Sequence, residues 1–156
     1  MLAMEEYTAF LGAVRSSTGL DMLVPDEDGL VSVRVDDTYN LNLQYVAPTG
    51  MILCFVEVTT LPEDAPRDTY RALLAGGLFG QDTAGGYFTL EPSSNIVIYN
   101  YFFNGEEAAR DVDGFVATLE KILQLCSLWS ERIADSLTAG EKAQTAEHPG
   151  NWNMFA

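Results

Sequence analysis

The residue types that most often carry enzymatic chemistry are sparse in this sequence. Histidine occurs once, as His148 near the C-terminal end. This excludes histidine triads, H-E-x-x-H zinc sites and multi-histidine metal sites from the rest of the chain. Cys54 lies in an apolar run and Cys126 in a helical pattern, so both are interpreted as small buried hydrophobic residues in a reducing compartment. We predict no catalytic residues and no metal site.

Motifs that bind phosphates or cations are also missing. There is no Walker loop, and residues 75–80 do not have the G-x-G-x-x-G spacing. The acidic groups at 26–28 and 36–37 have a calcium ligand's oxygen chemistry but lack the EF-hand spacing, so we interpret them as solvated turns. No cofactor is predicted. A hydrolase that assembles its carboxylates in space remains an alternative, although no spacing points to one.

Charge and composition narrow the range of partners. The chain has 156 residues, of which 23 are acidic and 8 basic, and its net charge is -15. Such a surface repels phosphate backbones and anionic membranes, whereas basic peptides match it. Residues 1–6 do not resemble a signal peptide, and no apolar run reaches the ~18 residues of a membrane span. We therefore expect a cytoplasmic protein with no nucleic-acid partner and no membrane insertion.

Hydrophobic periodicity divides the chain into eight elements. Apolar residues spaced by three and four predict helices over 5–18, 68–78 and 111–137. Alternating or continuous apolar runs bounded by turn residues predict strands over 31–35, 39–45, 51–60, 87–90 and 95–103. The order α-β-β-β-α-β-β-α indicates an α+β fold, a twisted antiparallel sheet covered by helices. We expect one domain over 1–138 and a flexible tail over 139–156.

Several local patterns, in their order along the chain, resemble those of the class I type III secretion chaperones, the Tir-chaperone (CesT-like) family. The resemblance covers residues 5 to 137. Gly77 departs from it, because the family usually has Asn at that position. The segments that carry it are Asp28–Val33, Tyr39–Leu43, Tyr70–Phe79, Thr83–Leu90, Phe115–Val116 and the pair Trp129 and Arg132.

The resemblance implies a bacterial, acidic homodimer that uses no nucleotide. Such chaperones bind the N-terminal chaperone-binding segment of a secreted effector in extended form and keep it soluble and competent for secretion. Two alternatives stay open. One is a regulatory or scaffolding protein of the same fold, and the other is the carboxylate-based hydrolase.

Two sets of residues are predicted to contact partners. An exposed sheet edge can accept a strand from a peptide, and apolar pockets on the sheet and under the first helix can take its side chains. The predicted effector contacts are Phe10, Val14, Val31, Val33, Leu41, Leu43, Phe55 and Val58. The resemblance implies a dimer interface on the second helix and second hairpin, with Leu73, Leu74, Leu78, Phe79, Ile98, Tyr99 and Tyr101. Apolar residues of the tail, Trp152 to Phe155, are a further hypothesis, in which they occupy the protomer's own groove.

Overall fold

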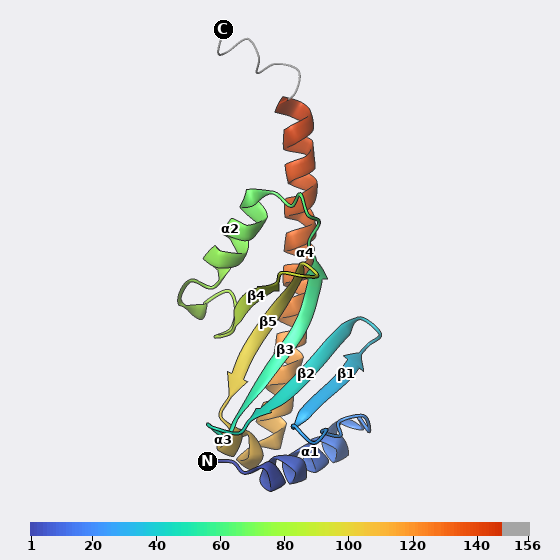
Figure 1. Ribbon diagram of the computed structural model, residues 1–156, viewed down its shortest axis with the longest axis vertical. Coiled ribbons are helices and arrows are strands. Elements are labelled where there is room, and N and C mark those ends of the chain that lie inside the picture. The colour runs from blue at the N-terminus through green and yellow to red at the C-terminus, as the bar shows by residue number, and fades with distance from the viewer. Residues whose placement is uncertain (148–156) are drawn as a thin grey trace.

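A computed structural model gives the structure of residues 1–147, with side chains described as far as Gly140. It contains a five-stranded sheet, helices at both ends of the sheet and one long helix along it (Figure 1). The elements are α1 (Met4–Thr18), β1 (Leu30–Val35), β2 (Tyr39–Val46), β3 (Met51–Thr60), α2 (Arg67–Gly76), the 3₁₀ turn η1 (Leu78–Gly80), β4 (Tyr87–Glu91), β5 (Ile96–Phe103), α3 (Gly105–Arg110) and α4 (Val112–Glu147).

The sheet is antiparallel throughout and has the order β1-β2-β3-β5-β4. The first three strands form an antiparallel meander, since each is joined to the next by a short turn. The second hairpin then adds β5 beside β3, with Cys54 opposite Tyr101. This arrangement places the two most apolar strands at the centre, where both of their long edges find partners over most of their length.

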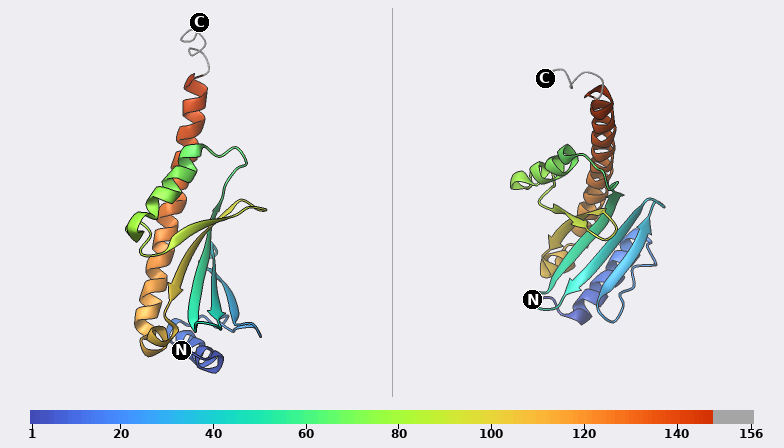
Figure 2. Two further views of the ribbon diagram at one scale, coloured as in Figure 1. Left: turned by 60° about the vertical axis from the view of Figure 1, so that its left-hand side comes forward. Right: turned by 45° about the horizontal axis from the view of Figure 1, so that its top comes forward.

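The core lies on one face of the sheet. The long helix α4 runs along this face, α1 crosses its lower end, and the views in Figure 2 show no helix of the described chain over the other face. One stripe of α4, with residues three or four apart, is buried against the strands. That stripe consists of Phe115, Leu119, Ile122, Cys126, Trp129 and Ile133.

Helix α1 forms because its apolar residues recur at the helical spacing and bury one stripe, which contains Tyr7, Phe10, Leu11 and Val14. It ends at Gly19, whose φ of 71° lies in the left-handed region that glycine adopts at no steric cost. The hydroxyl of Tyr7 donates a hydrogen bond to the carbonyl of Gly29 at 3.1 Å. This bond joins the helix to the entry of the first strand.

Trp129 connects α4 to the α2 end of the molecule. Its indole ring packs edge-on against Phe88 of β4, with 4.9 Å between ring centroids. Its Nε1 donates a hydrogen bond to the carbonyl of Asp82 at 2.9 Å. A β-carbon at Gly76, the last residue of α2, would lie 2.3 Å from the ring. The indole therefore fixes α2, the 81–86 loop and β4 relative to the long helix.

The α+β class and the predicted order of the eight elements are confirmed. Three details of the prediction were wrong. The short helix α3 was not predicted; Asn104 caps it, because its side chain accepts the amide hydrogen of Glu107. The second helix ends at Gly76 rather than at 78. The last helix continues to Glu147, so residues 139–147, expected in the tail, are helical.

The remainder of the expected tail, residues 148–156, lies outside the described residues. The hypothesis that Trp152 to Phe155 occupy a groove, and the placement of His148, are therefore not tested here. Within residues 1–147, no helix is both long enough and apolar enough to cross a membrane.

The packing at Gly76 predicts opposite effects for two similar glycine substitutions. Gly76→Ala should lower the free energy of unfolding by about 1–3 kcal/mol, because the added methyl group overlaps the ring of Trp129. Gly12→Ala should raise it by about 1 kcal/mol, because Gly12 lies inside α1 with its nearest neighbour 3.6 Å away and alanine is the better helix former. Urea denaturation at equal protein concentrations measures both, and equal effects would contradict this account.

Candidate functional site

The structure places most of the predicted effector contacts in the core. Seven of the eight side chains are buried. Because a buried side chain offers no surface to a partner, these residues stabilise the fold and are not available for binding in this structure. The buried residues are Phe10, Val14, Val31, Val33, Leu41, Leu43 and Val58. The eighth, Phe55, is only half-buried and lies on the opposite face of the sheet from Cys54 and Val56.

Phe55 belongs to an apolar strip on the uncovered face, which we call the open face and define by Leu53, Phe55, Ile98 and Phe102. Register brings these side chains together, since Leu53 lies opposite Phe102 across the β3–β5 pair. All four are partly or largely exposed. The sequence prediction missed Leu53 and Phe102. Their two-residue spacing from Phe55 and from Asn100 places them on the same face as these residues, but spacing alone does not show which face is exposed.

Hydrogen-bonded amides lie beside and within the open face. On one side Ser32 donates to Asn42 at 2.6 Å, and the side-chain amide of Asn40 donates to Glu57 at 2.7 Å. Within the strip, Asn100 lies opposite Phe55, and its side-chain amide donates to the hydroxyl of Thr89 at 2.9 Å. These contacts satisfy the polar groups within the protein. They leave the apolar strip as the part of this face with most to gain from a partner.

A second apolar surface lies around α2 and η1. Leu74 is 81% exposed, Leu78 is 63% exposed and Phe79 is 86% exposed. Together with the exposed Leu90 of β4, which lines the same small pocket as Leu74, they make up the surface that we call the α2 patch. Phe79 also has a φ of 56°, which is strained for a residue with a side chain. A large apolar side chain that is both strained and exposed is typical of a surface built for contact.

The other predicted interface residues are less accessible. Leu73, Ile98 and Tyr101 are half-buried, and Tyr99 is buried with its hydroxyl donating to the carbonyl of Thr83 at 2.8 Å. Tyr99 is therefore a core residue. Leu73 and Leu74 also line a small apolar pocket of about 160 Å³ between α2 and β4. The α2 patch and this pocket are continuous.

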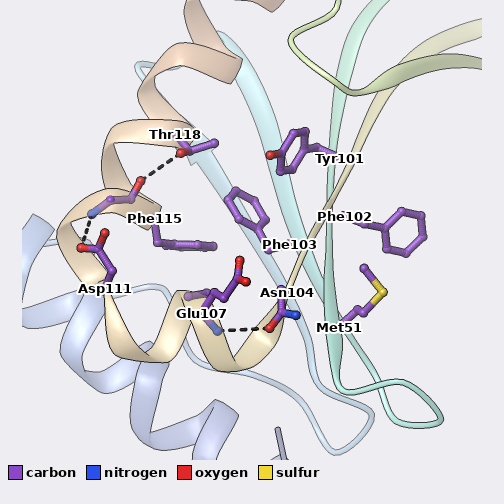
Figure 3. A pocket seen from close by; sticks show the side chains of 11 residues that line it. Met51, Tyr101, Phe102, Phe103, Asn104, Glu107, Asp111, Phe115 and Thr118 are labelled. Atoms are coloured by element: carbon purple, nitrogen blue, oxygen red, sulfur yellow. Dashed lines mark hydrogen bonds between the residues drawn. The ribbon is translucent and has the colours of Figure 1, made fainter. Parts of the chain in front are cut away.

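A larger cavity of about 510 Å³ opens where β5 ends and α3 and α4 begin (Figure 3). The aromatic rings of Tyr101, Phe103 and Phe115 form its wall, and the carboxylates of Glu107 and Asp111 lie beside them (Figure 3). We call it the β5 cavity. The sequence prediction included only Tyr101 of these five residues.

One family model matches the sequence, that of the Tir chaperone protein (CesT) family, over residues 11–130. The chain belongs to this family. The match spans α1 to the Trp129 region of α4 and so includes every strand of the sheet. None of the curated proteins matches the sequence.

Solved structures of the same fold include three complexes. A chain of the crystal structure of the ExsC–ExsE complex has a TM-score of 0.73 at 18% identity, covering 84% of this chain and 96% of that one. A chain of the HopA1–SchA chaperone–effector complex has a TM-score of 0.63 at 21% identity, and the match covers 86% of this chain and 99% of that one. A chain of the crystal structure of the Yersinia pestis type III secretion chaperone SycH, in complex with a stable fragment of YscM2, has a TM-score of 0.56 at 16% identity. The match covers 76% of this chain and 98% of that one.

The described residues of this family member contain no group of three or more potential metal ligands. The two thiols, Cys54 and Cys126, are both buried among apolar side chains. Burial raises the pKa of Cys54, and it raises the pKa of Cys126 to about 12. Thiolate is the nucleophilic form of cysteine, so neither residue is poised for chemistry in the folded protein.

The burial of the thiols predicts slow modification of the native protein. At pH 8 a disulfide reagent such as DTNB should react with Cys54 and Cys126 only as the protein opens, because both thiols are protonated and enclosed. After addition of guanidinium chloride both thiols should react rapidly, so that two equivalents of DTNB are consumed per chain. A fast single-equivalent reaction in the absence of denaturant would contradict this placement.

Proposed function

We propose that this protein is a type III secretion chaperone of the bacterial cytoplasm, which binds the N-terminal segment of a secreted effector in extended form and keeps it soluble and competent for secretion. It acts by binding and not by catalysis. The observation that carries the proposal is the one-sided sheet: in a member of the Tir chaperone family, an apolar strip lies on a face that no described helix covers. An extended chain is the ligand that fits such a surface.

The open face and the sheet edges offer an extended segment two kinds of contact. β1 and β4 are the outer strands of the sheet, so backbone groups along their outer sides have no strand partner within the described chain. Leu53, Phe55 and Phe102 then provide apolar contacts for side chains of the segment. The net charge of -15 favours a segment with basic residues and accelerates its encounter with the chaperone.

We further propose that the chaperone is a homodimer formed through the α2 patch. Leu74, Leu78 and Phe79 expose most of their surface in the isolated chain. Burial of a fully exposed large apolar side chain gives about 1.5–3 kcal/mol each, which is the scale on which a few such residues stabilise an interface. The α2 patch and the open face are distinct surfaces, so a dimer through the α2 patch leaves the open face of each protomer accessible.

Co-expression tests the chaperone function directly. The full chain is produced together with N-terminal fragments encoded by neighbouring genes, and the soluble fraction is purified on the chaperone. We expect a fragment that is insoluble alone to become soluble and to co-purify. A partner that binds only when folded, with no gain in solubility, would instead favour a regulatory or scaffolding protein. Capture of no fragment would contradict the proposal.

The open face predicts which substitution weakens capture of the fragment. Phe55→Ala should lower the affinity for the co-purified fragment about tenfold or more, because it removes an exposed aromatic contact, an effect of at least ~1.4 kcal/mol. Tyr39→Ala is the matched control, since Tyr39 is also a half-buried aromatic residue but packs against the core side of the sheet. Titration of labelled fragment measures both, and equal losses would remove the open face from the binding site.

The α2 patch predicts a change of mass. Light scattering should give twice 17.1 kDa for the wild-type protein, and Phe79→Glu combined with Leu74→Glu should give the monomer, since burial of two carboxylates is unfavourable. Met22→Glu is the control, because Met22 is 74% exposed and follows α1 in the chain, and α1 lies at the opposite end of the sheet from α2 (Figure 1). A monomeric wild-type protein, or a dimer insensitive to the α2 substitutions, would contradict this interface.

A further inference from the structure

The β5 cavity combines aromatic walls with acidic groups. Its rings pack on one another, with 4.8 Å between the centroids of Tyr101 and Phe103 and 4.5 Å between those of Phe103 and Phe115. Figure 3 shows these rings facing the space between β5 and α4, while Phe102 points to the opposite side. The cavity therefore has a rigid wall, because each ring is held by its neighbour.

The two carboxylates of the cavity have different local roles. Asp111 accepts the amide hydrogen of Gly114 at 2.9 Å and so caps the start of α4. Glu107 contributes only its backbone amide to a cap, through the side chain of Asn104. Its carboxylate forms no ion pair with any described residue, since the nearby Arg110 pairs with Glu106 instead. None of the residues that line the cavity is basic.

This combination of groups selects the charge of an occupant. An anion would be repelled by Glu107 and Asp111, and an apolar group would remove water from these carboxylates without replacing it. A lysine or arginine side chain satisfies both parts of the cavity. Its aliphatic stem packs on the aromatic wall, and its charged end contacts the ring faces and the carboxylates.

The free edge of β5 shows how such a side chain would arrive. β4 begins at Tyr87, opposite Asn100, so the last three residues of β5 have no strand on that side within the described chain. The carbonyl of Asn100 points toward Gly86 on the β4 side, where an added β-carbon would lie 2.5 Å from it. Backbone groups alternate along an antiparallel strand, so those of Phe102 point the same way, to the open edge beside the cavity.

We infer that the β5 cavity is a subsite for one cationic side chain, lysine or arginine, of a segment that pairs with the Phe102 edge of β5. The identity of that segment as part of an effector rests on the proposed function. The chemistry of the subsite rests only on the aromatic wall, on Glu107 and Asp111, and on the free edge. Glu107 is the residue that provides most of the charge selectivity, because Asp111 is already engaged as a helix cap.

A small probe tests the subsite without an identified partner. N-acetyl-arginine amide is titrated into the isotopically labelled full-length protein, and NMR shifts are followed at Gly114, Thr118 and the ring of Tyr101. N-acetyl-citrulline amide is the comparison, since it has nearly the same shape without the charge. We expect saturable shifts at these residues with the arginine probe, weakened by added salt, and much smaller shifts with citrulline.

Matched variants assign the effect to one carboxylate. Glu107→Gln should weaken binding of the arginine probe about fivefold, and Glu120→Gln, the same change at an exposed residue of α4 outside the cavity, should leave it unchanged. Equal shifts with both probes, no shifts with either, or equal behaviour of the two variants would overturn the inference. Fragment capture on co-expression is read out separately, so failure of the subsite and failure of the proposed function are distinguishable.

Discussion

The packing of one long helix against one face of the sheet is the interaction on which the rest of the structure depends. The stripe from Phe115 to Ile133 is buried along the strands, and α1 completes the same layer with Tyr7 and Leu11. One layer of helices can cover only one face. The second face then has to be satisfied within the sheet, which the amides of Asn42 and Asn100 do by hydrogen bonding, or by another molecule.

The surfaces left by this packing are arranged in a fixed relation to one another. Trp129 contacts Phe88 and Gly76 and bonds to the carbonyl of Asp82, so α2 cannot move independently of α4. The α2 patch, the open face and the β5 cavity are therefore parts of one rigid frame. A long extended partner can contact such a frame at several separate points. Each point adds affinity without further loss of the chaperone's conformational freedom.

Sequence periodicity predicted the elements but not which sheet face would be covered. Val31, Leu41 and Phe55 all have the apolar character of partner contacts. Only Phe55, however, lies on the face of the sheet opposite to the buried residues that α4 covers. Each strand has two alternating sets of side chains, and helices distant in sequence decide which set becomes part of the core. Helix α3 escaped detection because its sequence, Gly105 to Arg110, has no apolar stripe. The signal available there was Asn104 followed by two glutamates, an N-cap with an acidic first turn.

Separation of the buried face from the exposed face also explains how the fold persists while sequences diverge. Structures with TM-scores from 0.56 to 0.73 share only 16–21% of their residues with this chain. Stability requires apolar residues at alternate positions of each strand and along one helical stripe, which many sequences satisfy. The remaining strand positions, such as Leu53 and Phe102, carry little of the core. Residues at those positions can therefore change with the partner, and specificity for a segment can differ between chaperones while the scaffold remains the same.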